Sequence, residues 1–271
     1  PPEHLKKCSV CANAGFTRPN VKKVKHDKKR AFDKAVAWSV DLCGPFKEDR
    51  NGIKWVLGFT ETSAGFKKVY GLKRKTQKQC SQKLIEFINW SKTIEKNVTN
   101  IRSVGRIYTD RGKEFTSGPS DEGKEQGMFD TICAENNIKR RYTTPGMSRT
   151  NGWIERKHRT LGKSMRCALL DSKIGWKYWF DAQKYACDTR NAVESNIDGK
   201  IPYERFYDLK PNYREMVPFG TTGYIEKKSD KNSVERARKV TFIGHPDDTK
   251  GGHSPIIRAR YTQPGTRDLY T

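Results

Sequence analysis

Three short runs of strand-forming residues follow one another in the first third of the chain. They cover positions 35–42, 53–60 and 66–72 and are rich in Val, Trp, Phe and Tyr, which favour a half-buried pleated surface. Gly-Pro, Asn-Gly and Ser-Ala-Gly stretches, which are typical of turns, join them. Because consecutive strands with short connections usually pair, this pattern predicts an antiparallel meander and restricts the fold to one built on a sheet.

After the meander the pattern alternates between helix and strand. Leu84, Phe87 and Ile88 recur at helical spacing, and the apolar run 104–108 is again strand-like. The elements expected in chain order are a helix at 77–96, a strand at 104–108, a short helix at 128–136, a strand at 138–143, and helices at 151–170 and 176–192. Together they predict an α/β fold in which a mixed sheet, in the order βββαβαβα, is flanked by helices.

The end of the chain has a different character. Beyond Pro202 it is rich in Pro and Tyr and then offers strand-like pieces at 223–227, 238–244 and 255–261. We predict a small β-barrel-like module there. The expected division is a basic linker at 21–34, the larger α/β domain at 35–200, and a linker with a small basic β-rich module at 201–271.

The charge of the chain indicates its partner. Lys and Arg number 54 against 31 Asp and Glu, for a formal net charge of +23, and the excess is spread along the 271 residues. A polyanion, nucleic acid above all, is the partner that such a surface fits best. A ribosomal-type or membrane-surface protein is the alternative, but no apolar run approaches the roughly 20 residues that cross a membrane, so we expect no membrane partner.

The cysteines indicate the redox compartment of the protein, and the first residues indicate how the chain begins. Seven cysteines, five of them without a pattern, suit a reducing compartment better than a disulfide framework. The chain starts with Pro1 and has no leader-like segment, which is typical of an internal piece of a longer protein.

Three carboxylates stand where metal ligands would be placed. Asp41 ends the first predicted strand, Asp110 follows the fourth, and Glu155 lies early in the helix at 151–170. Singly, each acid is best explained as a turn, cap or surface residue. Jointly they fit a site for two Mg²⁺ (or Mn²⁺) ions, about 3.5–4 Å apart, of the kind that catalyses phosphoryl transfer on nucleic acids. The three acids converge if the first and fourth strands are neighbours and the helix packs across them; Glu114 is interpreted as a nearby loop residue.

A basic stripe accompanies Glu155. Arg159, Lys163 and Arg166 follow it at steps of four, four and three residues, so they share a helix face with it. Such a stripe is often only a solvated face, but it also suits contact with DNA phosphates. Further candidate DNA contacts from the same segment are Arg149, Asn151 and Lys157.

Cys8 and Cys11 have the spacing of one half of a zinc site. The other two ligands are missing, and His4 is the one nearby candidate. A lone cysteine pair is often incidental, so zinc binding by this chain alone stays a possibility rather than an expectation.

Four motifs together resemble a known family. They are CSVC at 8–11, VDLCGPF at 40–46, YTDRGKEF at 108–115 and TTPGMSRTNGWIERKHRTL at 143–161. From Cys8 to about Lys210 the chain resembles the integrase of copia-type (Pseudoviridae-like) long-terminal-repeat retrotransposons, in the retroviral integrase superfamily. This resemblance implies an RNase H-like core whose metal-binding acids are Asp41, Asp110 and Glu155, preceded by a zinc domain of which 1–20 is the remnant.

The resemblance also implies an activity and its setting. The implied reactions are 3′-end trimming of element DNA and strand transfer into target DNA, with double-stranded DNA as partner and a homo-oligomer, a dimer or tetramer, as the acting form. The implied location is the nucleus, with a cytoplasmic virus-like particle stage.

The chain also departs from the family pattern. The family commonly has Asn-Gly-Gly-Glu after the second Asp, where this chain has RGKE at 111–114, and an aromatic with a Gln pair where it has Gly146, Arg149 and Thr150. The 44 residues between Asp110 and Glu155 exceed the usual spacing, which we attribute to an insertion at 117–127. A ribonuclease H or cut-and-paste transposase, and a domesticated copy that only binds DNA, remain the alternatives.

Overall fold

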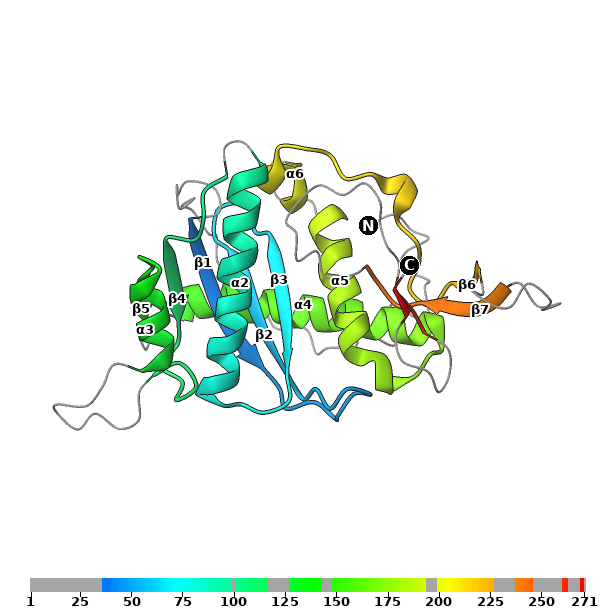
Figure 1. The fold of residues 1–271 in the computed structure, drawn as a ribbon, viewed down its shortest axis with the longest axis horizontal. Coiled ribbons are helices and arrows are strands. Elements are labelled where there is room, and N and C mark those ends of the chain that lie inside the picture. Colours follow the sequence, from blue (N-terminus) through cyan, green and yellow to red (C-terminus); the bar gives the residue numbers. More distant parts are fainter. Residues whose placement is uncertain are drawn as a thin grey trace.

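The structure, a computed structural model, describes residues 36–98, 101–116, 127–142, 148–193, 199–226, 237–245, 260–262 and 269–270. For 148–158 it describes the backbone alone. Two sheets are present in the described part, a five-stranded one and a four-stranded one (Figure 1).

The larger sheet has the strand order β3-β2-β1-β4-β5. Its strands are β1 (Ala37–Cys43), β2 (Trp55–Glu61), β3 (Lys67–Leu72), β4 (Arg106–Thr109) and β5 (Lys139–Tyr142). β1, β2 and β3 form the expected antiparallel meander, whereas β4 runs parallel to β1 and β5 runs parallel to β4. The predicted mixed sheet in the order βββαβαβα, flanked by helices, is therefore confirmed.

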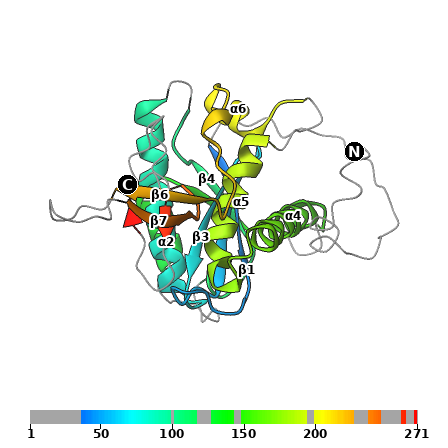
Figure 2. The ribbon, with the colours of Figure 1, turned by 90° about the vertical axis from the view of Figure 1, so that its right-hand side faces the viewer.

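Helices cover both faces of this sheet. α2 (Gln77–Asn97) and the short α3 (Met128–Glu135) lie on one face, and α4 (Ser148–Ser172) with α5 (Trp179–Val193) lies on the other. Figure 1 shows α2 in front of the sheet and α4 passing behind it, and Figure 2 shows the two helices on opposite sides. The sheet is thus the central layer of three.

Strand alternation distributes the side chains between two cores. Trp38, Phe59 and Ile107 point towards α2 and form one buried cluster with Phe87 of that helix. Their strand neighbours point the other way, where Val56 meets side chains of α4 and α5. The same alternation decides which face of the sheet carries each polar residue of β1 and β4.

The small helix α6 (Pro202–Tyr207) was not predicted, because six residues rich in Pro and Tyr show no helical periodicity. Its Phe206 is 1% exposed and belongs to the core cluster on the α2 side. The ring centroid of Phe206 lies 4.4 Å from that of Phe66 and 5.8 Å from that of Trp38. The start of the segment 201–271, which we assigned to a linker, is thus packed into the larger domain.

The second sheet has the order β6-β7-β8-β9 and is antiparallel throughout. Its strands are β6 (Thr222–Glu226), β7 (Ala237–Phe242), β8 (Arg260–Thr262) and β9 (Leu269–Tyr270). The third strand expected at 255–261 is observed at 260–262, and β9 was not predicted. Phe242 and Phe219 pack near Tyr185 of α5, with ring centroids 6.2 and 5.5 Å away. Closure of this sheet into a barrel stays a prediction.

No helix within the described residues is long and apolar enough to cross a membrane.

Candidate active site

The register of the larger sheet brings Asp41 and Asp110 to the same end of two neighbouring interior strands, β1 and β4. The parallel register of β1 and β4 pairs Ser39 with Tyr108, so two residues further along each chain are the two aspartates. Neighbouring strands are about 4.8 Å apart. Val40 points towards α2, so the alternation places Asp41 on the α4 side. Ile107 of β4 points towards α2, so the same alternation, continued one residue beyond Thr109, places Asp110 on the α4 side as well. The pairing of β1 with β4 confirms the expectation that the first and fourth strands are neighbours.

Asp41 is partly buried and has room around it. Its register partner on β2 is Gly58, which carries no side chain on that face. The Leu42 backbone N–H donates to Asp41 Oδ1 at 2.8 Å. Burial raises the pKa of the nearby Cys43 thiol, and the negative charge of Asp41 raises it further. Asp41 thus presents a carboxylate in a confined setting at the end of β1.

Asp110 is exposed and begins a tight loop. The Gly112 backbone N–H donates to Asp110 Oδ1 at 2.9 Å, which orients the carboxylate. A Cβ at Gly112 would lie 2.6 Å from Glu114 Oε1, so a larger residue at this position would have to displace the Glu114 carboxylate. Arg111 and Lys113, the two departures from the family pattern in this stretch, thus stand in an ordered turn rather than in an open loop.

Glu114 is oriented away from the two aspartates. Its side chain is buried and forms an ion pair with Lys75, with 3.0 Å between Oε1 and Nζ. Burial raises the pKa of Cys80, on α2, to about 12, and the charge of Glu114 is the second cause. Glu114 therefore lies towards α2, on the opposite side of the sheet, and supports the loop without joining Asp41 and Asp110.

Glu155 lies in the first half of α4, where the structure describes the backbone alone. α4 contacts β1 and packs on the sheet through Leu161, Met165 and Leu169. Glu155 is six residues before Leu161, about 9 Å along the helix axis. Its helix thus crosses the face that carries both aspartates, but the direction of its side chain lies outside the described part. The side chains of Arg149, Asn151 and Lys157 also lie outside the described part. Cys8 and Cys11 lie outside it entirely.

The carboxylates of Asp41 and Asp110 fit a divalent cation. Two carboxylates on adjacent parallel strands supply the hard oxygen ligands that Mg²⁺ prefers. Within the described residues no group of three or more His, Cys, Asp and Glu side chains could hold a metal ion. The side chain of Glu155 is not among the described ones, so this statement does not extend to a set of Asp41, Asp110 and Glu155.

The predicted basic stripe is on the surface. Arg159, Lys163 and Arg166 are all exposed, whereas Leu161 and Met165 between them are buried against the sheet. α4 therefore presents cations to solvent along one side while its apolar side anchors it beside Asp41.

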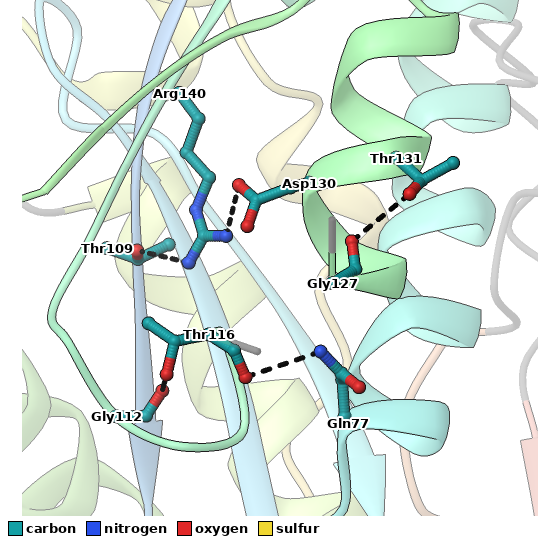
Figure 3. A network of polar contacts seen from close by, with 8 residues as sticks. All are labelled: Gln77, Thr109, Gly112, Thr116, Gly127, Asp130, Thr131 and Arg140. Carbon is teal, nitrogen blue, oxygen red and sulfur yellow. Dashed lines mark hydrogen bonds and ion pairs between the residues drawn. The ribbon is translucent and has the colours of Figure 1, made fainter. Parts of the chain in front are cut away.

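A buried arginine next to the site was not found from the sequence. Arg140 of β5 has 6% of its side chain exposed and contacts Thr109, the residue before Asp110 (Figure 3). In the sequence it is one of three consecutive basic residues at 139–141, which look like an ordinary exposed strand. Strand alternation could have separated Arg140 from its neighbours, but only the register of β5 on β4 shows what it faces.

Comparisons with known proteins agree with this architecture. No family model matches the chain. Its relatives include the Pol polyprotein of transposon TNT 1-94 of Nicotiana tabacum, 26% identical over 78% of this chain, and the Gag-Pol polyprotein of transposon Ty1-PR2 of Saccharomyces cerevisiae, 23% identical over 79%. The chain spans only 15% and 11% of the lengths of these two relatives.

A solved structure, the simian T-cell lymphotropic virus intasome in complex with a PP2A regulatory subunit, matches 97% of this chain and 84% of its own, at a TM-score of 0.53 and 16% identity. A magnesium complex of the HTLV-2 integrase catalytic core matches 66% of this chain at a TM-score of 0.48 and 18% identity, which is too weak a likeness to add to the assignment.

The sheet order and its flanking helices define an RNase H-like fold. The resemblance to the integrase of copia-type retrotransposons is confirmed, since the relatives are retrotransposon Pol polyproteins.

Proposed function

We propose that this chain is the integrase part of a retrotransposon polyprotein and acts as a divalent-metal-dependent polynucleotidyl transferase. In this function it trims the 3′ ends of element DNA and joins them to target DNA. The observation that supports this function best is the parallel pairing of β1 with β4, which brings Asp41 and Asp110 to the same end of these strands and the same face of the sheet.

Asp41, Asp110 and Glu155 are the residues that would hold two Mg²⁺ or Mn²⁺ ions. Such ions, when bound, activate the attacking oxygen and stabilise the leaving oxygen of a phosphoryl transfer. The chain's own contribution is to fix the ligands. The N–H of Leu42 donates to the carboxylate of Asp41, and the N–H of Gly112 donates to that of Asp110, so each carboxylate has one oxygen oriented by the backbone.

The exposed cations of α4 would hold the DNA. Arg159, Lys163 and Arg166 can contact phosphates beside the site, which positions the strand without reading its sequence. We propose Arg149, Asn151 and Lys157 as further contacts from the start of the same helix. The formal charge of +23 supplies the long-range attraction to a polyanion.

Partners and location follow as further parts of this proposal. We propose double-stranded DNA, both element ends and target, as substrate, and a homo-oligomer as the acting form. Cys8 and Cys11 would contribute two zinc ligands, the remaining ligands coming from residues upstream of the pair. The proposed location is the nucleus after a cytoplasmic virus-like particle stage.

A strand-transfer assay with oligonucleotide duplexes and Mg²⁺ or Mn²⁺ tests the function. The variants are Asp41→Asn, Asp110→Asn and Glu155→Gln, and the control is Glu86→Gln, which removes an exposed carboxylate from α2 on the other face of the sheet. We expect the three site variants to lose joining while they bind duplex DNA as the unchanged chain does, and the control to keep both.

The outcomes separate the alternatives. Joining that persists in Glu155→Gln would remove Glu155 from the mechanism. Joining that persists in all three variants would exclude the proposed site. DNA binding without joining by the unchanged chain would favour a protein that only binds DNA.

A further inference from the structure

Arg140, on the edge strand of the larger sheet, has four partners, of which Figure 3 shows Asp130 and Thr109. Its Nη1 lies 2.5 Å from Oδ1 of Asp130 on α3, and its Nη2 donates to Oγ1 of Thr109 at 3.1 Å. The guanidinium also lies over two rings, 4.9 Å from the centroid of Phe129 and 4.6 Å from that of Tyr142. These four contacts restrict the orientation of the Arg140 guanidinium.

Arg140 and Tyr142 contact the two residues that flank Asp110 in the sequence. Thr109, which accepts the hydrogen bond from Arg140, is the last residue of β4 and directly precedes Asp110. Arg111 directly follows Asp110, and its guanidinium lies 5.8 Å from the centroid of the Tyr142 ring, which Arg140 also contacts. Both chain neighbours of Asp110 are therefore tied to β5, one by Arg140 directly and the other through Tyr142.

Asp110 needs such support because its own backbone setting is weak. β4 and β5 are four residues long each, β5 is at the edge of the sheet, and Asp110 lies just past the end of β4. Strand ends open at low energetic cost, whereas a metal ligand must be held to within about 0.5 Å of its working position. A displaced Thr109 would change the separation between the carboxylates of Asp110 and Asp41.

We propose that Arg140 and Tyr142 are positioning residues that hold Asp110 beside Asp41 and so set the affinity of the candidate site for a divalent cation. This inference rests on the proposed function, since it assigns these residues to the same site. Neither residue touches a cation or substrate itself; each acts through the residue before or after Asp110.

A measurement of the free energy of unfolding would not distinguish this positioning role from a purely structural one, because loss of a buried Arg–Asp pair destabilises a protein in either case. Metal affinity measured on folded protein does distinguish them. Residues that orient a metal ligand typically change affinity 10–100-fold when replaced. A residue that only fills space beside α3 changes the melting temperature and leaves the affinity of the folded protein as it was.

The test is Mn²⁺ binding to the 271-residue chain without DNA, by isothermal titration, in the matched variants Arg140→Lys and Arg141→Lys. The two changes are the same and adjacent on β5, but Arg141 is exposed and lies on the other face of the strand. We expect Arg140→Lys to weaken Mn²⁺ binding about 10–100-fold and Arg141→Lys to change it less than about twofold. Equal affinities for the two variants, or equal losses, would overturn the proposal.

Further variants keep the test valid if Arg140→Lys does not fold. Thr109→Val removes the acceptor of the hydrogen bond from Arg140, and Thr109→Ser keeps the hydroxyl. Tyr142→Phe keeps the ring between the two guanidiniums, and Tyr142→Leu removes it. We expect weaker Mn²⁺ binding for the valine and leucine variants and unchanged binding for the serine and phenylalanine variants. The reverse pattern, or no difference within each pair, would contradict the role of Arg140 and Tyr142.

Asp110→Asn separates failure of this inference from failure of the proposed function. If Asp110→Asn binds Mn²⁺ as well as the unchanged chain, the candidate metal site itself is refuted. If it loses Mn²⁺ while Arg140→Lys binds normally, the site stands and only the positioning role is refuted.

Discussion

The salt dependence of DNA binding should fall when the exposed cations of α4 are removed. Arg159, Lys163 and Arg166 lie on the surface of the helix that crosses the candidate site, and the buried residues of the same helix stand between them. Replacing all three with Gln keeps much of the side-chain length and removes three charges, which lowers the formal net charge from +23 to +20. The fold should tolerate this, since surface changes of this kind usually alter the free energy of unfolding by less than about 0.5 kcal/mol each.

The size of the effect follows from the number of phosphates contacted. Each contact contributes about −0.9 to the slope of the logarithm of the binding constant against the logarithm of the salt concentration. Three contacts therefore contribute about −2.7, which the triple variant should lose. Between about 50 and 200 mM salt, the unchanged chain should lose roughly 40-fold more affinity than the variant.

Fluorescence anisotropy of a labelled duplex, titrated at several salt concentrations, measures this slope. The matched control replaces Lys78, Lys92 and Lys96 with Gln. These lysines are exposed on α2, on the other face of the sheet, and their removal changes the net charge by the same amount. A slope that falls equally in both triple variants would show that only overall charge matters. An unchanged slope in the α4 variant would refute its contact with DNA.

Two further predictions concern the core. Phe206→Ala should lower the free energy of unfolding by about 3–5 kcal/mol in urea, because it empties a buried site among aromatic rings. Leu209→Ala, at a residue 49% exposed, should cost less than about 0.5 kcal/mol, and equally small effects would place α6 outside the core. Burial raises the pKa of Glu61, so its contribution to stability is full below the pKa of the unfolded chain, about 4.3, and is lost as the pH rises through the folded pKa. The free energy of unfolding of the unchanged chain minus that of Glu61→Gln should therefore fall as the pH rises above about 4.3; a constant difference would contradict the raised pKa.

Periodicity predicted the elements of the larger domain well. The helix expected at 77–96 is observed as Gln77–Asn97, because Leu84, Phe87 and Ile88 make one face of it apolar. α6 and β9 escaped prediction, since six and two residues are too short to show a period. The assignment of 201–271 to a linker and a separate module missed the packing of Phe206, which is a contact with Trp38 and Phe66, far away in the sequence.

The candidate site was predicted in part. Asp41 and Asp110 were selected from their motifs, and the condition that would bring them together was the pairing of the first and fourth strands. That pairing joins residues 69 positions apart and depends on the whole sheet, so no local pattern contains it. Arg140 had no local signal, because its partners Asp130 and Thr109 come from two other elements.

The sequence by itself determined the type and order of the five strands of the larger sheet and of the four helices that flank it, the surplus of positive charge and the three candidate acids, because these depend on residue type and on spacing within one segment. Only the tertiary structure decided which strands are neighbours, that Asp41 and Asp110 share a face while Glu114 points to the other, and that β5 contacts the residues on both sides of Asp110. The physical reason is range: backbone hydrogen bonding and apolar periodicity act within a segment, whereas strand pairing and buried ion pairs join segments that only the folded chain brings together.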